Sequence, residues 1–163
     1  MPALAAQVLV LPAAAISLYV AWSDMRAMRI PNLSVLALVA VFALLGPVGL
    51  PLAEWGLRWL QLAAVLAIGF VASSLRLVGA GDAKFAAAMA PFVAPGDLRA
   101  FLALFAAVLL AAFVTHRGLG RVPAVRRMTP DWESWQRGRE FPMGLALGSA
   151  LMLYLGAAAL TGA

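Results

Sequence analysis

Cysteine is absent from this sequence of 163 residues, and histidine occurs once, at His116. Without cysteine the chain can form no disulfide framework, no thiolate zinc site and no cysteine nucleophile. With a single histidine as well, we predict no metal site and no other cofactor. Charge is also scarce: 12% of the residues are charged and 64% are hydrophobic, against about 45–50% apolar residues in soluble domains. The composition predicts a single all-α membrane domain over residues 1–163.

The apolar residues fall into six windows without a charged side chain: Leu4–Trp22, Leu33–Ala53, Trp59–Leu75, Phe85–Gly96, Ala100–Thr115 and Phe141–Ala163. A membrane helix needs about 17–25 residues. The fourth window has only about 12 residues and contains Pro91, so its helix reaches further only if it begins at Ala80 and carries Asp82 near the interface, where charge costs less. We therefore predict six transmembrane helices, of which the fourth is short.

Basic residues collect on one side of these predicted helices. Ten of the twelve lie in three loops on that side: Arg26, Arg29, Arg76, Lys84, Arg117, Arg121, Arg126, Arg127, Arg137 and Arg139. Arg58 and Arg99 fall on the other side. The positive-inside rule then places the three loops, including the polar loop 116–140, in the cytoplasm and both termini on the outer side. This topology accounts for the net charge of +5, so we expect membrane lipid and no nucleic acid among the partners.

Two carboxylic acids, Asp24 and Asp82, lie at the cytoplasmic ends of predicted helices. Two carboxyl groups around one water molecule can hydrolyse a peptide bond, because the ionised one removes a proton while the neutral one protonates the leaving nitrogen. Repulsion between close carboxylates separates their titrations. The helix macrodipole adds a smaller bias, which favours Asp24 as the neutral acid and Asp82 as the ionised base.

Each aspartate belongs to a distinctive segment. Asp24 precedes Ile30-Pro31-Asn32, and Asp82 lies in Gly79-Ala80-Gly81-Asp82-Ala83-Lys84. The two glycines permit a substrate backbone to approach the second aspartate, or they simply form the turn that opens a helix. Lys84 is a further candidate for substrate contact, although a lipid headgroup is its simpler partner. Pro31 fits the first turn of a helix, and the Asn32 side chain suits a hydrogen bond to backbone near Asp24.

Together these segments resemble the two aspartate motifs of the type IV prepilin peptidases, which are membrane aspartyl proteases with a Gly-x-Gly-Asp element. The order of the motifs, their places on the first and fourth helices and the number of spans agree over essentially the whole chain. The resemblance implies an endopeptidase that removes the basic leader from prepilins at the cytoplasmic surface of the bacterial inner membrane, with Asp24 and Asp82 as the catalytic pair. Pro142 and Gly144 resemble a Pro-x-Gly segment of the family, which we interpret as helix-start and packing chemistry.

The chain differs from the larger members of that family, which carry a cysteine-containing cytoplasmic domain and methylate the new N-terminus. Since no such domain is present, we expect no N-methyltransferase activity. The chain resembles the short peptidases of tight-adherence and Flp pilus systems. The alternative hypothesis is an ion- or proton-coupled transporter, because paired acids in membrane helices also mark ion pathways. It predicts acids near the middle of the membrane, whereas Asp24 and Asp82 lie at one surface.

Overall fold

A computed structural model describes residues 1–138 and 140–161, and all the secondary structure in these ranges is helical. The prediction of an all-α protein is therefore confirmed. The elements in chain order are α1 (Ala3–Ala27), α2 (Asn32–Gly49), α3 (Leu52–Ser74), α4 (Ala80–Met89), η1 (Ala90–Phe92), η2 (Pro95–Asp97), α5 (Leu98–Leu119), α6 (Pro123–Met128), η3 (Glu133–Trp135) and α7 (Met143–Thr161). Arg139, which entered the topology prediction, and residues 162–163 lie outside the described residues.

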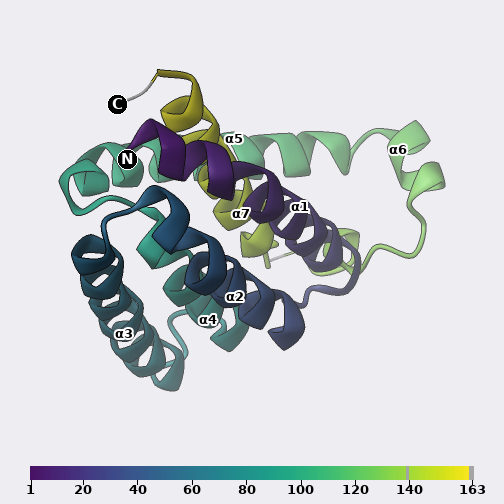
Figure 1. Ribbon diagram of the computed structural model, residues 1–163. Helices are drawn as coiled ribbons and strands as arrows, with labels where there is room; N and C mark the ends of the chain where they lie inside the picture. The colour runs from purple at the N-terminus through teal and green to yellow at the C-terminus, as the bar shows by residue number, and fades with distance from the viewer. Residues whose placement is uncertain (139, 162–163) are drawn as a thin grey trace.

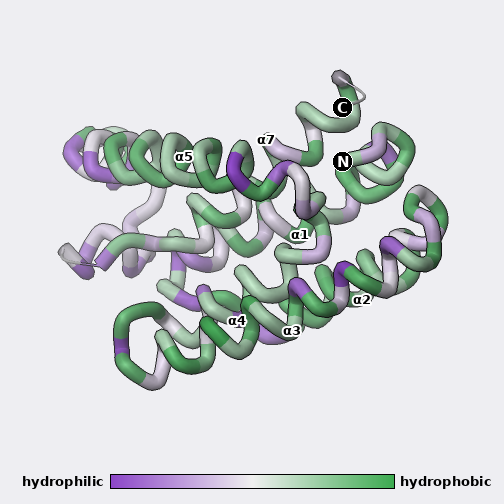
Figure 2. The backbone as a smooth tube through the Cα atoms, turned by 90° about the vertical axis from the view of Figure 1, so that its left-hand side faces the viewer, coloured by the Kyte–Doolittle hydropathy of each residue, from purple (hydrophilic) through white to green (hydrophobic). Residues whose placement is uncertain are grey.

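Five segments are long and apolar enough to cross a membrane: α1, α2, α3, Pro95–Leu119 and α7. Hydrophobic residues run along most of α5, and hydrophilic residues gather towards its ends (Figure 2). The fourth predicted span begins at Ala80, as expected, but its α-helix ends at Met89. Ten residues span only about 15 Å at 1.5 Å per residue. The chain is thus a multi-pass membrane protein with five candidate spans, and a sixth crossing and the outward position of the termini stay predictions.

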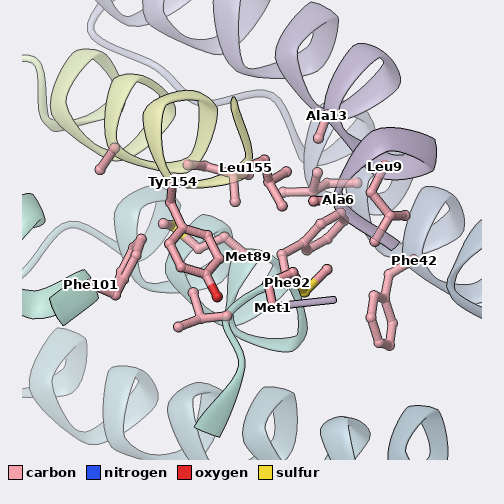
Figure 3. Close-up of a cluster of buried hydrophobic side chains, with 14 of the residues drawn as sticks. Met1, Ala6, Leu9, Ala13, Phe42, Met89, Phe92, Phe101, Tyr154 and Leu155 are labelled. Carbon is pink, nitrogen blue, oxygen red and sulfur yellow. The ribbon is translucent and has the colours of Figure 1, made fainter. Parts of the chain in front are cut away.

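The first and last long helices, α1 and α7, make the most extensive pairing in the fold (Figure 1). Small side chains allow them to approach closely. At Gly148 an added Cβ would lie 2.8 Å from the backbone oxygen of Ser17, so a larger residue would push the helices apart. Phe92 and Phe42, with ring centroids 5.4 Å apart, belong to the buried cluster beside α1 (Figure 3). The close contact between Gly148 and Ser17 holds α7 against the half of α1 that leads to Asp24.

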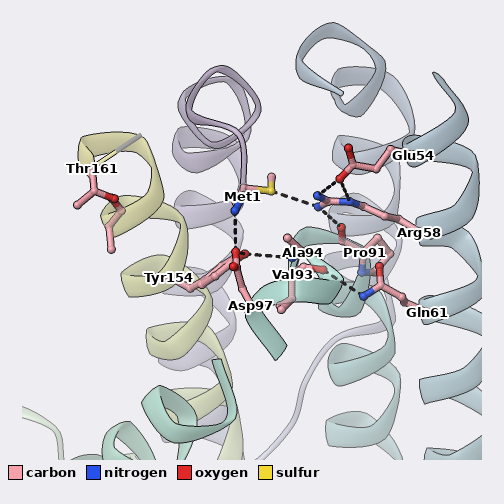
Figure 4. Close-up of polar contacts among 11 residues, drawn as sticks. Met1, Glu54, Arg58, Gln61, Pro91, Val93, Ala94, Asp97, Tyr154 and Thr161 are labelled. Atoms are coloured by element: carbon pink, nitrogen blue, oxygen red, sulfur yellow. Dashed lines mark hydrogen bonds and ion pairs between the residues drawn. The ribbon is translucent and has the colours of Figure 1, made fainter. Parts of the chain in front are cut away.

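The chain beyond α4 is held by a polar cluster, which we define as Glu54, Arg58, Asp97 and Tyr154 (Figure 4). The guanidinium of Arg58 donates to Glu54 Oε1 at 2.6 Å and to the carbonyl oxygen of Pro91 at 3.1 Å. Arg58 is only 1% exposed, whereas the topology prediction counted it only as one of two basic residues on the outer side. It is buried because the helix breaks at Pro91 and leaves a carbonyl group that needs a donor.

The polar loop 116–140 folds back against α5. His116, which ends up buried, stacks on Trp135 with ring centroids 4.8 Å apart. Trp135 also donates from Nε1 to Thr129 Oγ1 at 3.0 Å. The loop thus returns over the end of α5 and covers the imidazole of His116.

Candidate active site

Asp24 lies in the last turn of α1 and is only 5% exposed. Its carboxyl oxygen Oδ2 accepts a hydrogen bond from the backbone N–H of Gly144 at 2.7 Å. This N–H is free because the first turn of a helix has no preceding carbonyl to bond, and α7 begins at Met143. Pro142 precedes that start, and its carbonyl oxygen accepts a hydrogen bond from the N–H of Leu145 at 3.1 Å. The Pro142-x-Gly144 segment therefore anchors one of the two candidate catalytic acids.

The turn after α1 carries the chain past Asp24 towards α2. Met28 ends the helix in the left-handed region at φ 49°, and its N–H donates to the backbone oxygen of Asp24. Ser23 Oγ donates to the carbonyl oxygen of Arg29 at 2.9 Å and so holds the turn together. Pro31 caps the N-terminus of α2, one residue before the position that we predicted for it.

Asp82 lies in the first turn of α4, and Gly79 caps that helix. A Cβ on Gly79 would lie 2.6 Å from Oδ2 of Asp82, so a side chain there would displace the carboxyl group. A Cβ on Gly81 would lie 3.4 Å from Cβ of Ile30, which is ordinary contact with the turn after α1. A side chain at Gly79 would therefore force the carboxyl group of Asp82 to move. The expected contact of both glycines with a substrate stays a prediction.

One open pocket of about 490 Å³ contains both aspartates. Its lining residues are Asp24, Met28, Arg29, Ile30, Gly79, Ala80, Gly81, Asp82, Glu140, Phe141 and Met143. The segments that line it are far apart in the sequence and meet where α1 ends and where α4 and α7 begin. The fold therefore brings together the two acids that the sequence paired, and each lies at a helix end as predicted. Because Asp24 also meets a backbone donor from α7, the helix ends alone do not decide which acid is neutral.

Lys84 does not line the pocket of the aspartates. It lines a neighbouring pocket of about 430 Å³ with Pro31, Asn32 and Gly81. Its Nζ donates to Oδ1 of Asn32 at 3.2 Å. The expected bond from Asn32 to backbone near Asp24 is replaced by this contact, because the asparagine faces α4. Lys84 joins the Ile30-Pro31-Asn32 segment to the helix of Asp82, and its role towards substrate stays a prediction.

Sequence reasoning gave Gly144 a packing role and missed its hydrogen bond to Asp24. It also missed Phe141 and Met143, which line the pocket beside the acid. The signal was present in Pro142-x-Gly144, since a proline that opens a helix leaves the next N–H groups available as donors. The acceptor of that donor lies 120 residues earlier in the chain, a separation that no local pattern reveals.

Replacing Gly144 with Ala is expected to lower proteolytic activity about 10–100-fold. The new Cβ would lie 3.0 Å from Cβ of Asp24 and 3.1 Å from Cγ1 of Val20, so Asp24 has to shift, and a displacement of about 1 Å can cost roughly 100-fold in rate. Gly156→Ala in the same helix is the matched control, because nothing lies within 4 Å of its added Cβ. Cleavage rates at equal protein amounts are the measurement, and equal rates for the two variants would refute a role for this contact.

Comparison with protein families matches residues 11–116 to the type IV leader peptidase family. The matched range is more than half of the chain and contains both Asp24 and Asp82, whereas Gly144 lies beyond it. Comparisons with curated proteins and with solved structures return no match.

Proposed function

The chain belongs to the type IV leader peptidase family, and on this premise we propose that it is an aspartic endopeptidase that removes the leader peptide from type IV prepilins of the Flp class. We place it in the bacterial inner membrane, where it would cut at the cytoplasmic surface. Asp24 and Asp82 are the proposed catalytic residues. The arrangement that carries the proposal is the single pocket in which the ends of α1, α4 and α7 place these two acids.

Two carboxyl groups are sufficient for the reaction. One carboxylate takes a proton from a water molecule, whose oxygen then forms a bond to the carbonyl carbon of the substrate. The protonated carboxyl polarises the carbonyl oxygen and then gives its proton to the leaving nitrogen, so that the peptide bond breaks and the proton balance closes. The N–H of Gly144 holds the Asp24 carboxyl during this exchange, and such fixed orientation lowers the barrier.

The charge around the pocket agrees with a basic leader. Asp24, Asp82 and the exposed Glu140 line it, and Arg29 is the basic residue in the lining. Carboxylates attract the Lys and Arg side chains of a leader, mainly by raising its local concentration. Membership in a peptidase family favours this function over the ion-coupled transporter.

Coexpression with a tagged Flp prepilin tests the proposal. We expect the pilin to run at lower mass when the protein is present and at full mass with an empty vector. N-terminal sequencing of the product should place the new terminus just before the apolar helix of the pilin. A pilin that keeps its leader in the presence of well-expressed, membrane-inserted protein would contradict the proposed function.

A further inference from the structure

A second, apolar pocket of about 350 Å³ lies between α3 and α5, with α4 as its floor. Its lining residues are Gln61, Ala64, Val65, Ala86, Met89, Ala90, Val93, Leu98, Phe101, Leu102, Phe105 and Leu147. The helix α3 packs chiefly on α4, and α5 packs chiefly on α7, so the two walls belong to different pairs. Figure 2 shows α5 on one side of the molecule and α3 with α4 on the other. We call this pocket the α3–α5 groove.

The lining follows helical stripes. On the α5 wall, Leu98, Phe101, Leu102 and Phe105 lie at spacings of three, one and three residues. On the floor, Ala86 and Met89 lie three residues apart on α4, and Ala90 and Val93 belong to the 3-10 turn η1 and the residue after it. Positions related by three and four residues share one face of a helix. The α5 wall of the groove is therefore one continuous helix face, which is the form of site that accepts another helix along its length.

The groove begins where the aspartate pocket ends. Asp82 lines the pocket and Ala86, one turn further along α4, lines the groove. In the same way Met143 lines the pocket and Leu147, one turn along α7, lines the groove. From Asp82 to Met89, where α4 ends, the floor extends about 10 Å at 1.5 Å per residue, and the 3-10 turn η1 continues it to Val93. A chain cut at the aspartates and continuing into the membrane would follow this floor for about three helical turns.

We propose that the α3–α5 groove binds the apolar helix that follows the scissile bond of the substrate, and that it thereby sets the depth at which the chain is cut. This inference rests on the proposed function and adds the substrate-binding surface to it. Continuity with the aspartate pocket identifies the occupant, because a helix in the groove has its cytoplasmic end beside Asp82. Ala64, Ala86 and Ala90 lack bulk, and small residues let helix backbones approach closely in membranes.

Gln61 distinguishes a peptide from lipid as the occupant. Its Nε2 donates to the carbonyl oxygen of Val93 at 3.1 Å, while its buried Oε1 has no protein donor in the described part of the chain. An acyl chain offers no donor, and an unsatisfied polar atom in an apolar site is costly. A substrate helix that carries a hydroxyl side chain about three turns after the cleavage site supplies a hydrogen-bond donor for Oε1 of Gln61.

The test compares two synthetic peptides with the purified protein in lipid bilayers. The long peptide joins a basic leader to an apolar helix of about 20 residues, and the short peptide ends a few residues after the cleavage site. We expect Ala64→Trp, which fills the groove from an exposed position, to lower the ratio of kcat/KM for the long peptide over that for the short one at least ten-fold, mainly through KM. Ala63→Trp is the matched control, because Ala63 is exposed on α3 but does not line the groove, and it should keep the wild-type ratio.

If the ratio of kcat/KM for the long peptide over the short one is the same in the Ala64→Trp and Ala63→Trp variants, the groove does not bind the substrate helix. The proposed proteolytic function would be unaffected by that result. The proposal for the groove also fails if Ala64→Trp lowers kcat/KM equally for both peptides, because the groove then has an occupant other than the substrate helix. If the wild-type protein cleaves neither peptide, the proposed function itself fails. The two failures are thus separable.

The lack of cysteine permits a direct second measurement without background thiols. In an Asp82→Asn protein, Ala64→Cys should form a disulfide with a long peptide that carries one cysteine two turns after the cleavage site. Ala63→Cys should not form it. Equal crosslinking of the two variants, or none, would contradict the inference even if the Trp variant fails to fold.

Discussion

Replacing either Asp24 or Asp82 with Asn is expected to abolish leader removal while the protein stays in the membrane. Asparagine keeps the shape of the side chain and an oxygen that can accept the N–H of Gly144, but it can neither take up nor give the catalytic proton. General acid and base catalysis each contribute about 10²–10⁴-fold, so cleavage by either variant should fall below the limit of a gel-shift assay. Since the two acids act as one unit, the double variant should be no worse than either single one.

Asp131→Asn is the matched control for these two variants. Asp131 lies exposed in the polar loop, outside the lining of the aspartate pocket, so its loss should leave the cleavage rate at the wild-type level. The amount of each variant in the membrane fraction has to be equal for the comparison to hold. Complete processing by Asp24→Asn or by Asp82→Asn would remove that residue from the mechanism.

Replacing Arg58 with Met is expected to destabilise the protein by about 1.5–3 kcal/mol, the usual contribution of a hydrogen bond to a charged group. Pro91 lies in the 3-10 turn η1, where its carbonyl would bond the N–H three residues later, but that N–H, of Ala94, donates to the hydroxyl oxygen of Tyr154 at 3.0 Å instead. Arg58 Nη1 supplies the missing donor at 3.1 Å. The variant therefore leaves a buried carbonyl group unpaired and separates Glu54 from its cation. Thermal unfolding in detergent should shift down by several degrees.

Arg99→Met controls for the loss of a positive charge at this end of the molecule, because Arg99 is exposed at the start of α5. Its melting temperature should stay close to that of the wild-type protein, since a single exposed charge contributes little. If both arginine variants unfold at the wild-type temperature, the bond to the Pro91 carbonyl carries no stability and the break after α4 is held by packing alone.

The sequence predicted the helical class, the short fourth helix from Ala80 and the place of both aspartates at helix ends. Each of these depends on runs of apolar residues and on the glycines and prolines that start or end a helix. It did not predict where isolated polar residues go. Arg58 entered the topology prediction only as a basic residue on the outer side, yet it is buried and its guanidinium donates to the carbonyl oxygen of Pro91. Such a position depends on where the unpaired carbonyl lies in space, and the order of residues along one helix does not contain that information.

The same reason explains what was missed at the site. The motif of Asp82 predicted that glycines lie close to the acid, and Gly79 does so. The partner of Asp24, by contrast, comes from α7, and the partner of Asn32 comes from α4. Contacts between helices depend on how the helices pack in space. The hydrogen bonds of Gly144 to Asp24 and of Lys84 to Asn32 therefore could not be predicted from their own segments.

The bond between Gly144 and Asp24 also orders events during biosynthesis. The ribosome makes α1 and α4 well before α7, and 120 residues separate donor from acceptor. Both aspartates are therefore in the nascent chain before the group that fixes one of them has been synthesised. The pocket around the two aspartates is therefore completed only when α7, which supplies Met143 and the N–H of Gly144, packs against α1.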